Sequence, residues 1–490
     1  MRLYSENESY RLFHGSMLDV IAPNSIDSIV TDPPYELNFM NKGWDNSGIA
    51  FQPDTWEKCI KVLKPGGYLL AFGGSRTFHR IACAIEDAGF EIRDTIMWLY
   101  GQGFPKSLDL GKSIEAKLTT GSANTQEFKN LDGEKAKSGD LGFSSLQFRQ
   151  GARPADYGED EHLRTTKVAY TTPEGQQWDG WGTALKPAYE PIIVARKPCE
   201  GSAIDNVLKW GVGGINIDEC RVGTEIIGGG TTPSFRDVGK KSKDSIGIDK
   251  LSFGQVENAE RIEYEEHIGR FPANVILTYD ETDEQEVCGG MPQTTSSGGS
   301  GEKSINGNFK NVYGDYAGGV IPQHLGGLGD SGSAARYFYC AKASKKDRDE
   351  GLDGFEEQLT SVMALNANIN SDGEFTGMLR GRNTKMKNVH PTVKPTDLMQ
   401  YLVRLVTPTG GTVLDPFNGS GSTGKAVMYE NIERNSGYTY IGIELTDQYL
   451  PIAKARIEFA QTCILEERDG EMKATPRPVV SETKESSRLF

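Results

Sequence analysis

Residues 413–425, VLDPFNGSGSTGK, constrain the fold more than any other stretch of this chain. An apolar run leads into a glycine-rich loop, and a helix-forming stretch follows the loop. A strand, a tight turn and a helix in this order place backbone groups close to a bound ligand. Two incompatible interpretations fit the pattern, a phosphate-binding loop and a nucleoside-binding loop.

The phosphate-binding interpretation uses Gly419, Gly424 and Lys425, which fit the G-x-x-x-x-G-K pattern of nucleotide hydrolases. Such a loop needs Ser or Thr after the lysine, because that hydroxyl binds the magnesium ion held by the phosphates. Position 426 is alanine. A nucleotide hydrolase therefore stays an alternative that lacks its metal ligand, and Lys425 is expected to be an ordinary residue of the first helical turn.

The nucleoside-binding interpretation accounts for more of the sequence. Residues 412–414 and 438–443 are predicted strands, and the second strand ends at Glu444. An acid about twenty residues beyond the glycines accepts hydrogen bonds from both ribose hydroxyls, and the glycines let the ligand approach the backbone. The loop residues assigned to the ligand are Asp415, Phe417, Gly419 and Gly421.

Strands alternate with helices along much of the chain. Strands are predicted at residues 25–30, 68–72, 90–99 and 190–196, and helices at 51–63, 78–88, 397–406 and 449–460. Alternation of this kind indicates βαβ units. The predicted fold class is therefore α/β, a Rossmann-like doubly wound and mainly parallel sheet.

The first predicted strand stops abruptly at Thr31, and Asp32, Pro33, Pro34 and Tyr35 follow. Two consecutive prolines exclude helix and ladder pairing, so these residues form a rigid loop. Open α/β sheets bind ligands just beyond the carboxyl ends of their strands. We therefore expect the loop to be functional rather than a simple turn.

The composition limits the class of protein. The chain has 490 residues, a net charge of -15 and seven cysteines without C-x-x-C spacing, which argues against a zinc site and a disulfide framework. No apolar run reaches the ~20 residues that cross a bilayer, and the N-terminus lacks a signal pattern. We expect no membrane partner, no metal and a cytoplasmic location, and nucleic-acid binding would require a local basic surface.

The pattern divides the chain into six segments. Periodicity fades over residues 111–177, which read as an insertion, and the composition turns charged after residue 462. The segments are 1–110 with the Asp32 loop, 111–177 as a mobile insertion, 178–198 as a strand of the core, 199–389 as an irregular module, 390–462 with the glycine loop, and 463–490 as a flexible tail.

Basic residues gather late in the irregular module. Residues 341–348, AKASKKDR, are rich in lysine, and residues 375–394 contain no acidic residue. In an acidic chain such a local excess makes contact with phosphates plausible. The candidate phosphate contacts include Lys342, Lys345, Lys346, Arg348, Arg380, Arg382, Lys385 and Lys387.

Three motifs together resemble those of the amino-DNA methyltransferases. They are TDPPY at residues 31–35, HPTVKP at 390–395 and DPFNGSG at 415–421. Their order, with the catalytic loop first, resembles the circularly permuted beta group. Residues 63–67 and 72–80 resemble the versions carried by bacteriophages and prophages, which implies a bacterial host cell. The resemblance covers roughly residues 10–110, 178–200 and 335–460.

The resemblance implies methyl transfer from S-adenosyl-L-methionine to an exocyclic amine of a base flipped out of double-stranded DNA. Asp32 and the Pro33 carbonyl would each accept one amino hydrogen, and Tyr35 would stack on the base. Asp rather than Ser before the prolines favours adenine N6, with cytosine N4 as the alternative. Residues 199–389 would recognise the target, and the basic residues named above, from Lys342 to Lys387, would contact the DNA backbone. A homodimer and a cognate restriction enzyme are both compatible with the group.

On the cofactor side, the resemblance assigns Phe417, Gly419 and Gly421 to the methionine and adenosine, and Asp415 to the methionine amino group. Thr392 and Lys394 would bind the cofactor carboxylate. Relatives carry Gly-Asp where this chain has Gly15 and Ser16, so Ser16 is expected to contact the adenine, with Asp19 as a substitute. No metal is expected, because the sulfonium already supplies the electrophile.

Overall fold

The protein is described by a computed structural model. It describes residues 1–16, 21–37, 43–100, 107–121, 170–228, 231–233, 261–263, 266–280, 291, 293–295, 309–311, 314–316, 331–343, 345–360, 384–468 and 471–476. The predicted residues Asp19, Arg380 and Arg382 lie outside this part of the chain. None of the helices in it is long and apolar enough to cross a membrane.

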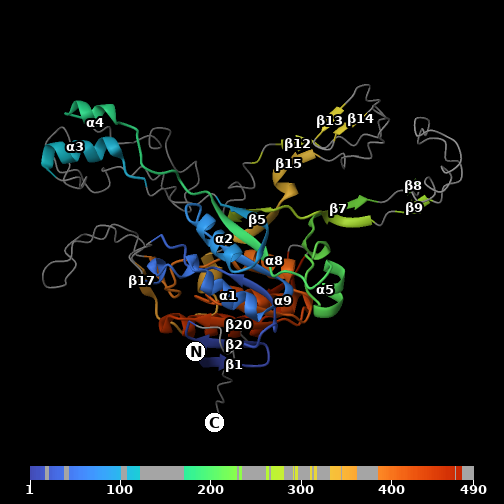
Figure 1. Cartoon of the computed structure of the whole chain (residues 1–490). Coiled ribbons are helices and arrows are strands. Elements are labelled where there is room, and N and C mark those ends of the chain that lie inside the picture. Colours follow the sequence, from blue (N-terminus) through green and yellow to red (C-terminus); the bar gives the residue numbers. More distant parts are fainter. Residues whose placement is uncertain are drawn as a thin grey trace, which may run out of the picture.

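A ten-stranded sheet runs through the molecule (Figure 1). Most neighbouring strands are parallel, but the first pairs antiparallel with the second, and the seventh in sheet order is antiparallel to both its neighbours. This mainly parallel α/β sheet confirms the predicted fold class. In sheet order the strands are β1 (Arg2–Glu6), β2 (Tyr10–His14), β20 (Thr439–Glu444), β19 (Thr412–Asp415), β3 (Ile26–Thr31), β4 (Leu63–Phe72), β6 (Tyr189–Arg196), β5 (Glu91–Leu99), β11 (Val275–Asp280) and β16 (Tyr339–Ala343).

Strands from the two ends of the chain lie side by side in this sheet. β19 pairs in parallel with β3, with Val413 opposite Ser28 and Leu414 opposite Ile29, and on its other side with β20. Parallel neighbours end at the same edge of a sheet. The loops that follow β3 and β19 therefore meet, although almost 400 residues separate them in the sequence.

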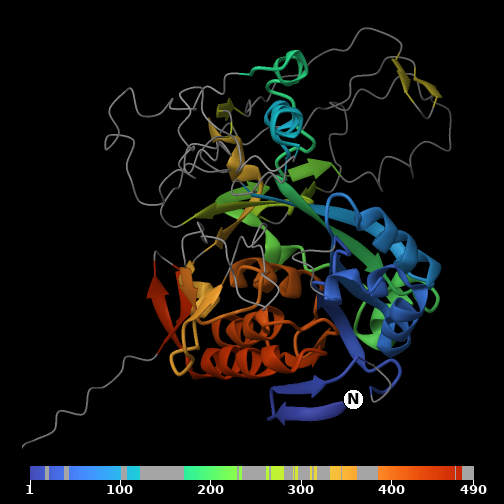
Figure 2. The ribbon, with the colours of Figure 1, turned by 90° about the vertical axis from the view of Figure 1, so that its left-hand side faces the viewer.

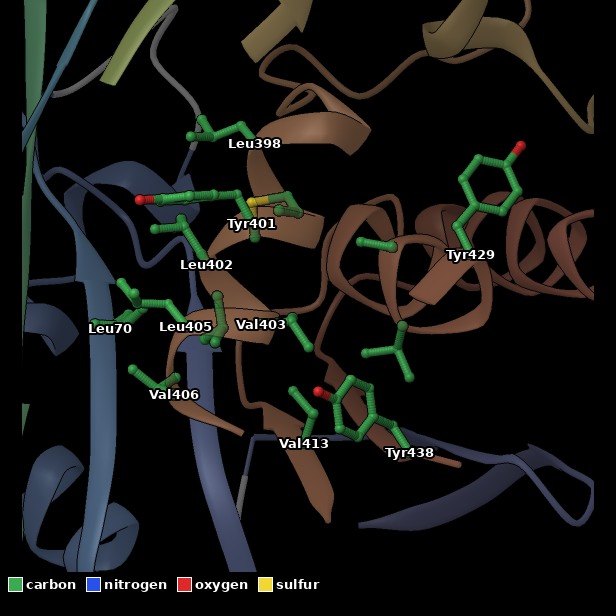
Figure 3. Packing of buried hydrophobic residues seen from close by; sticks show 14 of the residues in the cluster. Leu70, Leu398, Tyr401, Leu402, Val403, Leu405, Val406, Val413, Tyr429 and Tyr438 are labelled. Carbon is green, nitrogen blue, oxygen red and sulfur yellow. The ribbon is translucent and has the colours of Figure 1, made fainter. Parts of the chain in front are cut away.

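Side chains of the central strands alternate between two cores, as the pleat requires. On β4, Leu70 and Phe72 face one core, while Leu69 and Ala71 face the other. Helices α8 (Thr396–Val406), α9 (Ser422–Arg434) and α10 (Leu450–Thr462) cover the first face, and α1 (Pro53–Val62) and α2 (Phe78–Asp87) cover the second (Figure 2). Figure 3 shows α8 packed against β4 and β19. A sheet buried on both faces explains why its strands read as apolar runs.

Several boundaries differ from the sequence prediction. β4 begins at Leu63, whereas the sequence predicted a strand only from residue 68. β11 and β16 come from the irregular module and extend the main sheet beyond β5. Neither was predicted as a strand, because pairing with a distant strand is not a local property of the chain.

The predicted insertion and tail contain regular structure. In the insertion, α3 (Leu110–Thr120) and α4 (Pro173–Gln177) pack together, and buried Glu115 accepts hydrogen bonds from the backbone and side chains of Thr171 and Thr172. The expected flexible tail begins with a hairpin of β21 (Ile464–Arg468) and β22 (Glu471–Thr475). The hairpin packs on α9, where Ala474 N–H donates to Glu433.

Shorter elements complete the described chain. Helix α5 (Ala203–Trp210) begins with a capping box of Ser202 and Asp205 and packs on β4. A further short helix is α7 (Lys345–Asp349). Further antiparallel strand pairs lie outside the main sheet: β7 (Val222–Gly228) with β10 (Glu266–Arg270), β8 (Thr231–Pro233) with β9 (Arg261–Glu263), β12 (Gln293–Thr295) with β15 (Ser331–Ser333), β13 (Phe309–Asn311) with β14 (Gly314–Tyr316), and β17 (Gln358–Thr360) with β18 (Thr384–Met386). Short 3-10 helices occur at Gly43–Asn46, Ile49–Phe51, Asp218–Cys220, Ala334–Tyr337 and Asp447–Tyr449.

Candidate active site

A cavity of about 1360 Å³ lies where the central parallel strands end. It brings together residues of all three motifs, from the loop after β3, the segment before α8 and the loop after β19. The predicted residues that line it are Ser16, Asp32, Pro33, Pro34, Tyr35, Thr392, Lys394, Asp415, Phe417, Gly419 and Glu444. Open α/β sheets bind their ligands at this position.

The Asp32 carboxylate is held at one oxygen and unpaired at the other. Lys394 Nζ lies 2.6 Å from Oδ2, whereas Oδ1 is buried and has no hydrogen-bond partner within the described residues. Burial raises the pKa of Asp32, and Lys394 only partly offsets this. A buried acceptor without a donor costs about 1–3 kcal/mol and calls for a functional explanation.

Tyr35 is fixed at three points beside Asp32. Its hydroxyl donates to Glu190 Oε2 at 2.7 Å, and its carbonyl accepts the Thr77 hydroxyl at 2.8 Å. A Cβ at Gly74 would come within 3.2 Å of its ring, so the glycine lets the loop after β4 lie directly against the loop after β3. Tyr35 is therefore a rigid wall of the cavity.

Lys394 lies beside Asp32 on the cavity wall. It was assigned to the cofactor carboxylate, but its Nζ contacts Asp32 and lies 3.5 Å from Glu190, with the Tyr35 and Phe72 rings at 5.3 and 4.9 Å. Burial alone would lower the pKa of Lys394, but the two carboxylates raise it above its ordinary value. The lysine stays charged and orients Asp32.

Asp415 ends β19 as a buried carboxylate surrounded by donors. Oδ1 accepts the Thr31 hydroxyl at 2.6 Å and the Phe417 N–H at 3.1 Å, and Oδ2 accepts the Thr423 hydroxyl at 2.7 Å. Burial raises the pKa of Asp415 to about 7, although these hydrogen bonds favour the charged form. A cationic ligand group would therefore find an acid that ionises near neutral pH.

The glycine loop is packed against two other motifs. Gly419 N–H donates to Glu444 Oε2 at 2.7 Å, and Gly419 has a left-handed φ of 50°. A Cβ at Gly419 would lie 2.8 Å from His390 Nε2, so a side chain there would push the HPTVKP segment away. Burial raises the pKa of Glu444, whose other oxygen accepts the Thr446 N–H. Each carboxylate oxygen keeps acceptor capacity for a further donor.

His390 is a neutral structural residue of this wall. Burial lowers its pKa to about 3, and because the Thr392 carbonyl can only accept, His390 Nδ1–H donates to it at 2.9 Å. This bond turns residues 390–394 so that Thr392 and Lys394 both line the cavity.

Phe417 and Gly421 occupy the two ends of the loop. The Phe417 ring packs against Trp56 of α1, with centroids 6.3 Å apart. Gly421 has a φ of 75°, and its Cα faces the backbone of Ala453 so closely that a Cβ would lie 3.0 Å from that backbone. Gly421 therefore supports the loop from behind and is not among the residues that line the cavity.

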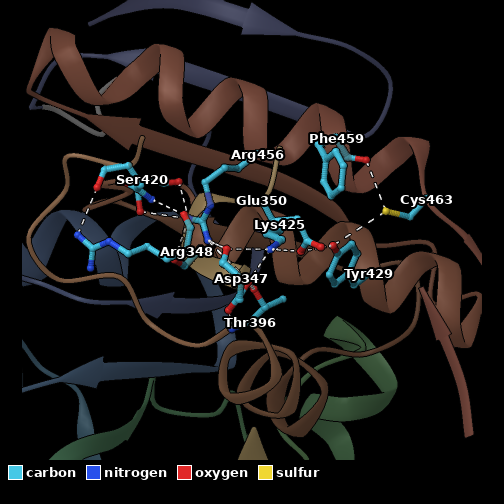
Figure 4. A network of polar contacts seen from close by, with 12 residues as sticks. Asp347, Arg348, Glu350, Thr396, Ser420, Lys425, Tyr429, Arg456, Phe459 and Cys463 are labelled. Carbon is cyan, nitrogen blue, oxygen red and sulfur yellow. Dashed lines mark hydrogen bonds and ion pairs between the residues drawn. The ribbon is translucent and has the colours of Figure 1, made fainter. Parts of the chain in front are cut away.

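Lys425 lies in the first turn of α9, as predicted, but it is more than an ordinary helix residue. Its side chain is fully buried, and Nζ binds Asp347 at 2.5 Å and Glu350 at 2.7 Å, next to Tyr429 and Arg456 (Figure 4). Burial alone would raise the pKa of Asp347, but Lys425 and Arg456 lower it. The Lys425 side chain points away from the cavity side of the glycine loop. It is therefore not available to bind a phosphate, as the lysine of a phosphate-binding loop must be.

The predicted DNA-contacting residues fall into several environments. Lys346 is exposed on α7, and Lys387 pairs with Asp353 at 3.3 Å. Arg348 donates to the carbonyls of Asn388 and His390 and lines the cavity. Lys342, Lys345 and Lys385 lie in β16, α7 and β18, where only their backbone is described.

Glu190 was missed by the sequence analysis as a site residue. β6 is antiparallel to its neighbours, so its first residues arrive at the edge where β3 and β19 end. The sequence shows an acid at the start of a predicted strand. It does not show the direction of that strand in the sheet, which decides whether the acid reaches the site.

Comparisons with known proteins identify a family for this chain. The family model N6_N4_Mtase, described as DNA methylase, matches residues 26–455. The Type II methyltransferase M2.LlaDCHI of Lactococcus lactis subsp. cremoris is 23% identical over 263 residues, which cover 49% of this chain and 90% of that protein. The Type II methyltransferase M.HpaI of Haemophilus parainfluenzae is 30% identical over 146 residues, 29% of this chain and 46% of that protein.

Among solved structures, the M1.HpyAVI-SAM complex aligns with 91% of this chain and 99% of its own, at 13% identity and a TM-score of 0.30. Similarity at this level transfers no site geometry.

Proposed function

The chain belongs to the N6/N4 DNA methylase family, and we propose that it transfers a methyl group from S-adenosyl-L-methionine to the exocyclic N6 amine of adenine in double-stranded DNA. The observation that carries the proposal is the environment of Asp32. One carboxylate oxygen is bound by Lys394 and the other has no donor within the described residues, on the wall of a cavity shared with the glycine loop.

The residues around the glycine loop fit the cofactor. Asp415 is a buried acid for its ammonium group, and Glu444 keeps acceptor capacity for the ribose hydroxyls. Gly419 presents backbone without a side chain to the cavity. When bound, S-adenosyl-L-methionine supplies an electrophilic methyl group on a sulfonium sulfur, so the protein residues need only prepare the amine.

An exocyclic amine of a base is a poor nucleophile, because its lone pair is delocalised into the ring. We assign to Asp32 Oδ1 and the Pro33 carbonyl the two amino hydrogens, which concentrates electron density on nitrogen. Lys394 fixes the Asp32 carboxylate in one orientation, and Glu190 fixes Tyr35 as the surface on which the base stacks. Asp32, whose pKa burial raises, is the base we assign to the proton that nitrogen gives up.

Adenine is favoured over cytosine N4 by the aspartate before the two prolines. A carboxylate accepts an amino hydrogen more strongly than the serine hydroxyl that would stand there otherwise. The base has to leave the duplex to reach the cavity. We place the activity in the bacterial cytoplasm, with residues 199–389 recognising the target, and a homodimer and a cognate restriction enzyme remain compatible with it.

Substitution of Asp32 tests the proposal. Asp32→Asn is isosteric but removes the charged acceptor, and we expect transfer of labelled methyl from S-adenosyl-L-methionine to DNA to fall about 100-fold or more. Cofactor affinity, measured by calorimetry, should change little, because Asp32 does not belong to the glycine loop.

The matched control is Asp27→Asn. Asp27 lies on the same strand at its other end, where it binds Lys64 at 2.6 Å and the Thr412 N–H at 2.8 Å. This variant should lose stability and keep methyl transfer by its folded fraction. Methyl transfer by Asp32→Asn equal to that of the control would contradict the assigned chemistry.

A further inference from the structure

One stretch of the cavity wall is not used by the chemistry described above. It is the loop of residues 183–188, which joins α4 to β6, and all six of its residues line the cavity. Because β6 begins at the edge where β3 and β19 end, this loop lies just beyond that edge, on the same side as Asp32. Figure 1 shows the connection descending from α4 to the sheet.

The loop carries an unusually exposed side chain. Leu185 is 93% exposed, the highest value among the exposed large apolar residues of the described chain. Single exposed leucines are common on protein surfaces and mean little alone. Here the leucine lies on the rim of the catalytic cavity and is followed by a basic residue, Lys186.

The loop is anchored on both sides of Leu185. Before it, Ser107 Oγ accepts the N–H groups of Thr183 and Ala184 at 2.9 and 3.2 Å, and Thr183 Oγ1 accepts the Leu108 N–H at 2.9 Å. After it, the Ala188 carbonyl accepts the Tyr100 N–H at 3.0 Å. Pro187 further restricts the backbone. The leucine is therefore presented on a short, braced loop.

Base flipping leaves a gap in the base stack that an apolar side chain such as Leu185 could fill. Extruding a base costs unstacking free energy and leaves a gap in the stack. Proteins that separate base steps commonly insert an apolar side chain such as leucine between them, and lysines contact the adjacent phosphates. A fully exposed leucine gains the most from such burial.

We propose that residues 183–188 form a DNA wedge, in which Leu185 enters the base stack beside the flipped base and Lys186 contacts the neighbouring backbone. The inference rests on the proposed function and adds a site to it. DNA is favoured over a protein partner because the leucine borders the cavity that receives the base and is followed by a cation in an otherwise acidic chain.

The test compares Leu185→Ala with the unchanged protein on two duplexes. Both carry the sequence found methylated in expressing cells, and in one of them the target base is mismatched, so that it is already partly unstacked. On the matched duplex, kcat/KM should fall about tenfold or more, the equivalent of losing the burial of one leucine. On the mismatched duplex, the variant should recover to within about threefold of the unchanged protein.

Two further variants make the result specific. Leu185→Met should behave like the unchanged protein, because it restores a long apolar side chain. Leu208→Ala removes a leucine that is 82% exposed on α5 and does not line the cavity, and should leave both duplexes unaffected.

Equal losses on both duplexes, or no loss on either, would overturn the wedge while leaving methyl transfer intact. A loss accompanied by a changed sedimentation coefficient of the free protein would instead assign the loop to a protein interface and also overturn the wedge. Absence of methylation by the unchanged protein would contradict the proposed function itself, and the inference with it.

Discussion

At the scale of single residues, two carboxylates and one ammonium share the buried end of the cavity. Lys394 lies between Asp32 and Glu190, and the Tyr35 hydroxyl binds Glu190. Burial raises the pKa of Asp32, Lys394 lowers it, and the negative charge of Glu190 raises it again. The balance sets the pH at which Asp32 becomes a charged acceptor.

Glu190→Gln tests this coupling. The variant keeps an acceptor for the Tyr35 hydroxyl but removes a negative charge near Asp32, so the pKa of Asp32 should fall. Because methyl transfer needs the ionised form, the loss of kcat at acid pH should move to lower pH. A pH profile of kcat measures this, and an acid limb that stays in place or moves to higher pH would refute the coupling.

Asp415 makes a separate prediction about stability. Its pKa is raised from 3.8 to about 7, so the folded state holds a proton there that the unfolded state has already lost. Stability from this group is complete below pH 4 and declines as the pH rises to about 7, by on the order of 4 kcal/mol. Asp415→Asn should remove this decline.

Urea unfolding at pH 5 and pH 8 gives the change in the free energy of unfolding between the two pH values, and this change is compared between the unchanged protein and Asp415→Asn. The free energy of unfolding should drop between the two pH values by a larger amount in the unchanged protein than in Asp415→Asn. Equal drops would show that Asp415 is already ionised at pH 5 in the folded state.

The sequence identified the acids of the cavity wall that occur in compact motifs at strand ends. Asp32, Asp415 and Glu444 each follow or end a predicted strand, and the structure brings them to one edge. Glu190 and the partner of Lys394 could not be predicted in the same way. Both depend on which strands are neighbours and on their direction, which no local pattern encodes.

At the scale of elements, a buried ionic network joins α7 to three helices of one sheet face. Asp347 binds Lys425 of α9, lies 4.0 Å from Arg456 of α10, and accepts hydrogen bonds from Thr396 of α8 (Figure 4). Arg456 also donates to the Ser420 carbonyl at 2.8 Å, so the network supports the glycine loop from below. Its members hold the loop without contacting its ligand side.

Lys425→Met should therefore lower the stability of the protein, and we expect no effect on nucleotide binding. Removing one partner of a buried ion pair costs about 3–5 kcal/mol, because the remaining carboxylates stay buried without their cation. The control Lys454→Met removes an exposed lysine that lies 3.8 Å from Glu458 on α10, and should cost about 1 kcal/mol or less.

Chemical unfolding of both variants gives these values, and phosphate release from ATP tests the rejected alternative. Substantial ATP turnover by the unchanged protein that disappears in Lys425→Met would restore the phosphate-loop interpretation.

Most helices and strands of the central sheet could be predicted from the sequence, but their first and last residues were predicted less well. Periodicity placed α2, α8 and α10 within one or two residues, and apolar runs marked the central strands. The hairpin of β21 and β22 was missed, because half of its strand residues are charged and its order comes from packing on α9. The start of β4 was predicted too late, because the strand begins at Leu63 and its register to β3 shifts before Tyr68.

At the scale of the whole molecule, the sheet joins the Asp32 loop, which comes early in the chain, to the glycine loop, which comes late. The permuted order was predicted from the order of the motifs, and the adjacency of β3 and β19 gives it a physical meaning. The cavity lies between two segments that are distant in the sequence and adjacent in the sheet. The acidic total charge of the chain excludes neither DNA binding nor the proposed activity, because contacts with DNA depend on local charge.

Nucleoside mass spectrometry tests the central claim most directly. DNA is taken from bacteria that lack their own adenine and cytosine methylation and express either the unchanged protein or Asp32→Asn. We predict N6-methyladenine with the unchanged protein and a level lower by about 100-fold or more with Asp32→Asn. N4-methylcytosine without methyladenine, or equal methyladenine in the two samples, would contradict the account.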